Sequence, residues 1–95
     1  TLMEGLAKIT IMPAERLEGI SPQMKRKGRL QIGSDADITV FDPMNIIDTA
    51  TFEDDLSASI GVEHVIVNGV FVVKDADNVD GALPGRPVVG RRIVF

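Results

Sequence analysis

Two runs of β-branched residues joined by Asn68-Gly69 constrain this chain more than any other feature of its sequence. The runs, residues 62–67 and 70–74, predict a β-hairpin, because Asn and Gly tolerate the positive φ angles of a type I′ turn. A two-residue turn also sets the register of the strands, so Val67 is expected to lie opposite Val70. Counting outward predicts the pairs Ile66–Phe71, Val65–Val72, His64–Val73 and Glu63–Lys74.

Both faces of this predicted hairpin are apolar. One face carries the larger side chains, His64, Ile66, Phe71 and Val73, and the other carries Val65, Val67, Val70 and Val72. A hairpin with one solvated face would alternate apolar and polar residues, so this pattern predicts protein cover on both sides. We expect the isolated chain either to associate with itself through the valine face or to fold its N-terminal helix across that face.

Composition indicates a small aliphatic domain that belongs to a longer protein. The 95 residues include four Phe and no Trp or Tyr, so Val, Ile and Leu must supply the core. A net charge of −4 disfavours nucleic acid and anionic membranes as partners. The absence of Cys excludes disulfides and thiolate metal sites, and the absence of a leader or membrane-spanning run favours a cytoplasmic location. Because the chain opens at Thr1 without an initiator Met, we expect a fragment.

Two short helices are expected before the strands. Thr1 and Glu4 can form a capping box for a first helix through Ile9, which should end before Pro13. Pro13 suits the first turn of a second helix, with Gly19 as its C-terminal stop. Further extended segments are predicted at residues 30–32, 36–41, 46–47 and 92–95, with the basic run 25–27 in a loop.

No group of side chains in the sequence makes an active site. His64 is the only histidine and is expected to pack opposite Val73, since zinc and catalytic sites need several convergent groups. Asp35 and Asp37 have the spacing of paired metal carboxylates, but both are better explained as residues that fix the turn after Gly33-Ser34. The acidic residues Glu53, Asp54 and Asp55 lack the spacing of a calcium-binding loop and are interpreted as a solvated loop. Ser57 and Ser59 lack the sequence motif of a serine nucleophile. We therefore assign no catalytic, cofactor-binding or metal-binding residue.

Several motifs resemble the C-terminal end of the amidohydrolase superfamily. They are residues 10–17 (TIMPAERL), residues 28–43 (GRLQIGSDADITVFDP) and the Val67-Asn68-Gly69 hairpin. Residues 48–53, 61–65 and 81–86 are similar to the end of D-aminoacylases, the N-acyl-D-amino-acid deacylases. The chain departs from that family at residues 54–59, where the family usually has a proline-containing segment.

The resemblance implies an enzyme with a metal-bearing (β/α)₈ barrel and a small β-sandwich. In such enzymes a zinc-activated water attacks the amide carbonyl, and the metal ligands and catalytic aspartate would all precede Thr1. Residues 1–18 would be the helical end of the barrel and its connector, and residues 28–95 the β-sandwich part of one C-terminal domain.

The sequence thus predicts a mainly β, non-catalytic domain whose parent enzyme hydrolyses N-acyl-D-amino acids. Its partner would be the barrel of its own enzyme, with a homo-oligomer possible and no nucleic acid or membrane involved. Two alternatives remain open, namely a fragment of a dihydroorotase- or hydantoinase-like cyclic amidase, and a free-standing β module that binds another protein.

Overall fold

A computed structural model describes residues 1–90, and the chain divides into two compact units. One unit is formed by residues 1–36 together with the segment that begins at Gly85, and the other by residues 37–84. The strand predicted at residues 92–95 lies outside the described residues.

The first unit is helical. Helix α1 (Leu2–Ile9) has the predicted capping box, in which the Thr1 hydroxyl accepts from the Glu4 backbone N–H. Helix α2 (Ile11–Leu17) begins two residues earlier than predicted, but Pro13 still lies in its first turn, where a missing N–H costs no helical hydrogen bond. A 3₁₀ helix, η1 (Pro22–Arg26), occupies part of the segment that we had expected to be a loop.

The segment predicted as extended at residues 30–32 is instead a turn, closed by the Ser34 N–H donating to the Gln31 carbonyl. The prediction was wrong because Leu30 and Ile32, which suggested a strand, are 79% and 105% exposed and pair with no neighbouring strand. Val89 bonds the start of η1, where the Ser21 hydroxyl donates to the Val89 carbonyl at 2.6 Å and the Val89 N–H donates to Gln23 Oε1 at 2.8 Å.

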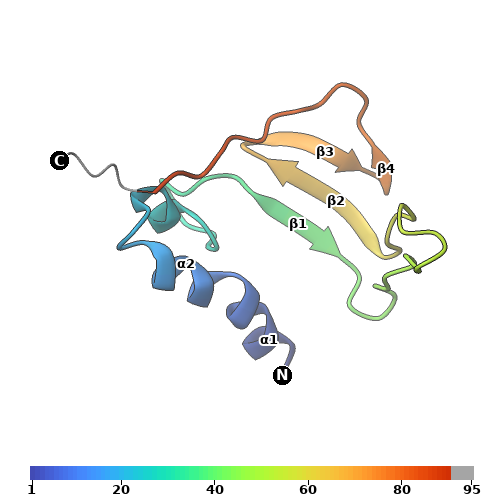
Figure 1. Ribbon diagram of the computed structural model, residues 1–95, viewed down its shortest axis with the longest axis horizontal. Coiled ribbons are helices and arrows are strands. Elements are labelled where there is room, and N and C mark those ends of the chain that lie inside the picture. The colour runs from blue at the N-terminus through green and yellow to red at the C-terminus, as the bar shows by residue number, and fades with distance from the viewer. Residues whose placement is uncertain (91–95) are drawn as a thin grey trace. The chain divides into compact units, whose positions relative to one another are not determined.

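The second unit is an antiparallel sheet. Its four strands are β1 (Ile38–Phe41), β2 (Val62–Val67), β3 (Val70–Lys74) and β4 (Asp77–Asn78), in the order β1-β2-β3-β4 (Figure 1). The strand predicted at 36–41 is two residues shorter, the one at 46–47 is reduced to a single bridge between Ile47 and Ile60, and β4 was not predicted. The structure confirms a small antiparallel sheet preceded by short helices, but the described helices cover as much of the chain as the strands, so the class is mixed rather than mainly β. A second sandwich layer stays a prediction.

The hairpin turn is confirmed, but its register is only partly so. Asn68 and Gly69 have φ angles of 50° and 78°, as a type I′ turn requires. The pairs Val67–Val70 and Ile66–Phe71 match the prediction, and then an irregularity places Val65 opposite Val73. A bulge adds one residue to one strand, so the predicted Val65–Val72, His64–Val73 and Glu63–Lys74 pairs are wrong. Val73 therefore belongs with Val65 rather than with His64.

Burial in the described residues is slight. Ala14 is the one buried hydrophobic residue among them, at 1% exposure, and most β2 side chains are only half-buried. The backbone of Gly28 lies close to the start of helix α2, since a Cβ on this glycine would lie 2.5 Å from the Thr10 carbonyl oxygen and 3.1 Å from the Ala14 Cβ. Much apolar surface therefore remains uncovered in both units.

Candidate functional site

Two long-range hydrogen bonds hold the Asn68-Gly69 turn. The Asn68 backbone N–H donates to Asp37 Oδ1 at 2.9 Å, and the Asn68 side-chain amide donates to the Pro84 carbonyl at 2.7 Å. Asp37 was expected to fix the turn that precedes β1. The structure shows its carboxylate bound to a hairpin 31 residues away, so Asp37 joins the start of β1 to the β2–β3 turn.

Asp35 has a different environment from Asp37 and lies in the helical unit. Its carboxylate contacts Lys27 Nζ at 2.9 Å and Arg26 Nε at 3.8 Å, and its backbone N–H donates to the Arg26 carbonyl. These contacts close the loop between η1 and residue 35 and engage two members of the basic run. Asp35 thus has a structural role, but its carboxylate contacts the basic run, whereas the sequence predicted that it would fix the turn after Gly33-Ser34.

Asp42 organises the turn after β1, where the sequence also predicts a turn. Its carboxylate accepts from the side-chain amide of Asn45 and from the Met44 backbone N–H, and these bonds lower the pKa of Asp42. The Asp42 backbone N–H donates to the Gly61 carbonyl at 2.8 Å. The Asp42-Pro43 pair predicts a turn at the end of the strand, but it does not predict that the Asp42 carboxylate holds the turn.

Gly61 lies against this turn at the entry to β2. Its φ is +91°, and a Cβ there would lie 2.5 Å from the Ile46 Cα and 2.6 Å from the Ile46 nitrogen. The position therefore accepts only glycine without a shift of the backbone.

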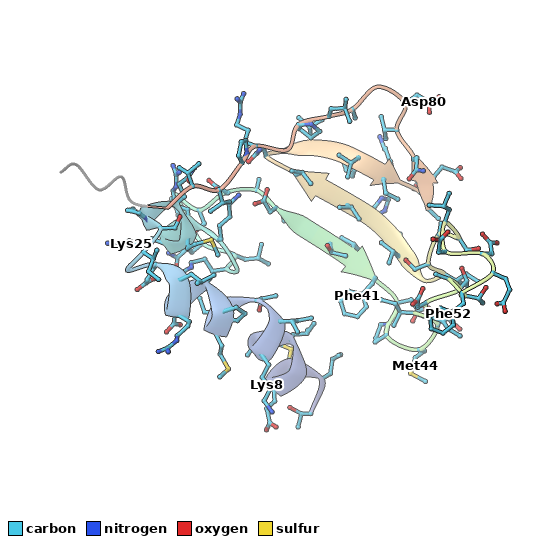
Figure 2. The ribbon with its side chains drawn as sticks, in the orientation of Figure 1. Lys8, Lys25, Phe41, Met44, Phe52 and Asp80 are labelled. Carbon is cyan, nitrogen blue, oxygen red and sulfur yellow. The ribbon has the colours of Figure 1, made fainter. Side chains whose placement is uncertain are left out.

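The acidic loop that follows makes its own hydrogen bonds. The Ser57 hydroxyl donates to Asp54 Oδ2 at 2.6 Å, the Asp54 N–H donates to the Thr51 hydroxyl, and the Thr51 N–H donates to the Asp54 carbonyl. Ser57 is thus hydrogen-bonded to a carboxylate of its own loop and not to His64. Figure 2 shows Phe52 on this loop and Met44 on the preceding turn, both at the end of the sheet where β1 stops.

His64 contacts a turn and an aromatic ring. Its Nδ1 accepts from the Asp75 backbone N–H at 3.2 Å, and its Nε2 lies 3.9 Å from an Asp75 carboxylate oxygen. The imidazole meets the Phe71 ring edge-on, with 5.8 Å between the ring centroids. The expected packing opposite Val73 is wrong because the bulge moves Val73 out of that register.

These candidates do not converge on one centre. Within residues 1–90 there is no group of three or more His, Cys, Asp or Glu side chains placed to hold a metal ion. The described helices also lack the length and apolar character needed to cross a membrane. These residues instead hold three separate segments. Asp37 holds the β2–β3 turn, Asp42 holds the turn after β1, and His64 holds the turn at Asp75.

Comparison with known proteins shows which family the chain resembles. The amidohydrolase family profile matches residues 1–73. The chain is 42% identical over 76 residues to an N-acyl-D-glutamate deacylase of Alcaligenes xylosoxydans xylosoxydans, which covers 80% of this chain and 14% of that protein. A D-aminoacylase of the same organism is 49% identical over 43 residues, covering 45% of this chain and 9% of the relative.

A third relative, an N-acyl-D-aspartate deacylase of that organism, is 38% identical over 63 residues, covering 66% of this chain and 12% of its own. No solved structure matches the chain significantly. The chain thus spans only about a seventh of the first relative's length. Because the family profile covers more than three quarters of its residues, the chain belongs to the amidohydrolase family, and its relatives include D-aminoacylases.

Proposed function

We propose that this chain is the C-terminal structural part of a metal-dependent amidohydrolase that hydrolyses N-acyl-D-amino acids. The observation that carries this proposal is the similarity to three relatives that are all named as deacylases or aminoacylases of D-amino acids. Their names differ in the amino acid, which is glutamate in one and aspartate in another, so the proposal extends to the class and not to one substrate.

In this proposal the chemistry belongs to a (β/α)₈ barrel elsewhere in a cytoplasmic enzyme, where bound zinc would activate a water for attack on the amide carbonyl. The present chain supplies a small sheet whose turns are held by Asp37 and Asp42. Its exposed apolar side chains would pack against the barrel or contribute to a subunit contact.

The direct test is an assay of the complete enzyme that includes this chain. We expect hydrolysis of N-acetyl-D-glutamate, N-acetyl-D-aspartate or N-acetyl-D-methionine, with the corresponding L enantiomers as matched controls. Hydantoin and dihydroorotate test the cyclic-amidase alternative in the same assay. Preferential opening of either ring, or a preference for L substrates, would overturn the proposal.

The isolated 95-residue chain provides a second test, of its non-catalytic role. We expect no hydrolysis of N-acetyl-D-methionine above buffer and no stoichiometric zinc by elemental analysis, since zinc sites require several convergent ligands. Turnover by the chain alone, or one tightly bound zinc per chain, would show that the catalytic centre had been assigned to the wrong part of the enzyme.

A further inference from the structure

The β3–β4 turn is built from residues that are poorly suited to it. Asp75 and Ala76 join Lys74 to Asp77 with φ angles of 51° and 67°. Two consecutive positive φ angles are typical of a type I′ turn, in which Gly usually occupies the second position. Alanine in the left-handed region is disfavoured by its Cβ, so this turn needs support from outside itself.

That support comes from the neighbouring strand β2. The Ala76 backbone N–H donates to the Glu63 carbonyl at 2.8 Å, and the Asp75 backbone N–H donates to His64 Nδ1 at 3.2 Å. One of the two bonds is made by backbone groups and does not titrate. The other needs a lone pair on Nδ1, which only the neutral imidazole with its proton on Nε2 provides.

We propose that His64 is a pH-sensitive clasp of the β3–β4 turn, closed when the imidazole is neutral and open when it is protonated. Protonation places a hydrogen on Nδ1, which then faces the Asp75 N–H instead of accepting from it. The turn keeps the bond to Glu63 but loses the one to His64. Residues 75–78 are therefore expected to loosen as the pH falls.

The groups around the imidazole decide whether another charge could reverse this effect. Asp75 is the acidic side chain that faces it, 3.9 Å from Nε2, but that carboxylate is 82% exposed, so its attraction for the imidazolium is screened by solvent. On β3 the Phe71 ring meets the imidazole, and Lys74 lies 5.2 Å from the Phe71 centroid. On β1 the residue paired with His64 is the apolar Val40. Protonation of His64 therefore affects the turn mainly by removing the acceptor of the Asp75 N–H, and less by the attraction between the imidazolium and the Asp75 carboxylate.

The experiment is an NMR titration of the uniformly ¹⁵N-labelled 95-residue chain between about pH 8 and about pH 5, the range over which imidazoles titrate. At high pH we expect the ¹⁵N shifts of His64 to show the Nε2–H tautomer. The Asp75 amide proton should move with the same midpoint as the His64 ring protons. After correction for intrinsic exchange, Asp75 protection should fall by about two- to tenfold, the equilibrium effect of one hydrogen bond. Ile47, whose N–H is bonded to the Ile60 carbonyl, serves as the internal reference.

Two variants separate the imidazole from the carboxylate. His64→Gln replaces the titrating acceptor by an amide oxygen, so the pH dependence at Asp75 should disappear. Asp75→Asn keeps the backbone N–H and removes the charge, so the pH dependence should remain. An Nδ1–H tautomer in the wild-type chain, or an Asp75 amide that ignores the His64 midpoint, would overturn the clasp. So would a pH dependence that survives in His64→Gln and vanishes in Asp75→Asn.

Discussion

At the scale of single residues, the sheet unit depends on side chains that are small or absent. Gly61 lets the chain enter β2 at a φ of +91° while its Cα lies against the backbone of Ile46. The carbonyl of the same residue accepts from the Asp42 N–H, so the glycine and the aspartate hold the two ends of the loop region 42–61 together. Gly69 also has a positive φ, but nothing lies within 4 Å of where its Cβ would be.

These two glycines make a matched pair for mutation. Gly69→Ala adds only the cost of a left-handed alanine, about 1–2 kcal/mol. Gly61→Ala should destabilise the chain by at least about 3 kcal/mol. The new Cβ would also clash with backbone atoms of Ile46, which can move away only if the chain itself shifts. The midpoints of urea unfolding measure both changes. Equal midpoints for the two variants would contradict the close approach between Gly61 and Ile46.

At the scale of elements, the two turns of the β2–β3–β4 meander share a conformation and differ in composition. The first has Asn-Gly, and the second has Asp-Ala with φ angles of 51° and 67°. Ala76→Gly should therefore stabilise the sheet by about 0.5–1 kcal/mol, since glycine removes the steric cost at positive φ but has more freedom in the unfolded chain. A rise in the urea midpoint is the expected result.

The control for that prediction is Ala58→Gly, at an exposed loop position without a positive φ. There glycine only adds freedom to the unfolded chain, so the midpoint should stay level or fall. If Ala58→Gly raised the midpoint as much as Ala76→Gly, the gain could not be attributed to the turn.

At the scale of the whole molecule, more large apolar side chains are exposed than buried among residues 1–90. Phe52 and Leu56 are 106% and 91% exposed on a loop that is ordered by its own hydrogen bonds. We expect these two side chains to form an interaction surface, because a partner that covered them would remove apolar area from water. In the proposed enzyme this surface would be covered.

For the isolated chain, we expect this surface to cause self-association. The double change Phe52→Ser, Leu56→Ser should weaken association in sedimentation velocity without lowering the urea midpoint, since neither side chain is buried. Ile66→Thr, at a half-buried position of β2 outside the predicted valine face, is the control and should lower the midpoint. A wild-type chain that stays monomeric at high concentration would show that the exposed loop does not cause self-association.

The sequence by itself determined the features that depend on neighbouring residues. The Asn68-Gly69 turn and the Thr1–Glu4 capping box follow from local backbone preferences and short hydrogen bonds, and both are present as predicted. The family motifs were also recognisable, because they are carried by the order of the residues and not by their contacts. Even the first two pairs of the hairpin register follow from the turn alone.

Only the tertiary structure decided where those local pieces meet. The irregularity between Val65 and Ile66 shifts the register, His64 binds a turn that sequence reasoning did not predict, and Asp37 bonds a hairpin 31 residues away. Each of these depends on two segments that are distant in sequence and must satisfy backbone hydrogen bonds together. The backbone preferences of neighbouring residues do not describe such long-range pairs. A residue's partner is therefore set by packing once the sheet has formed.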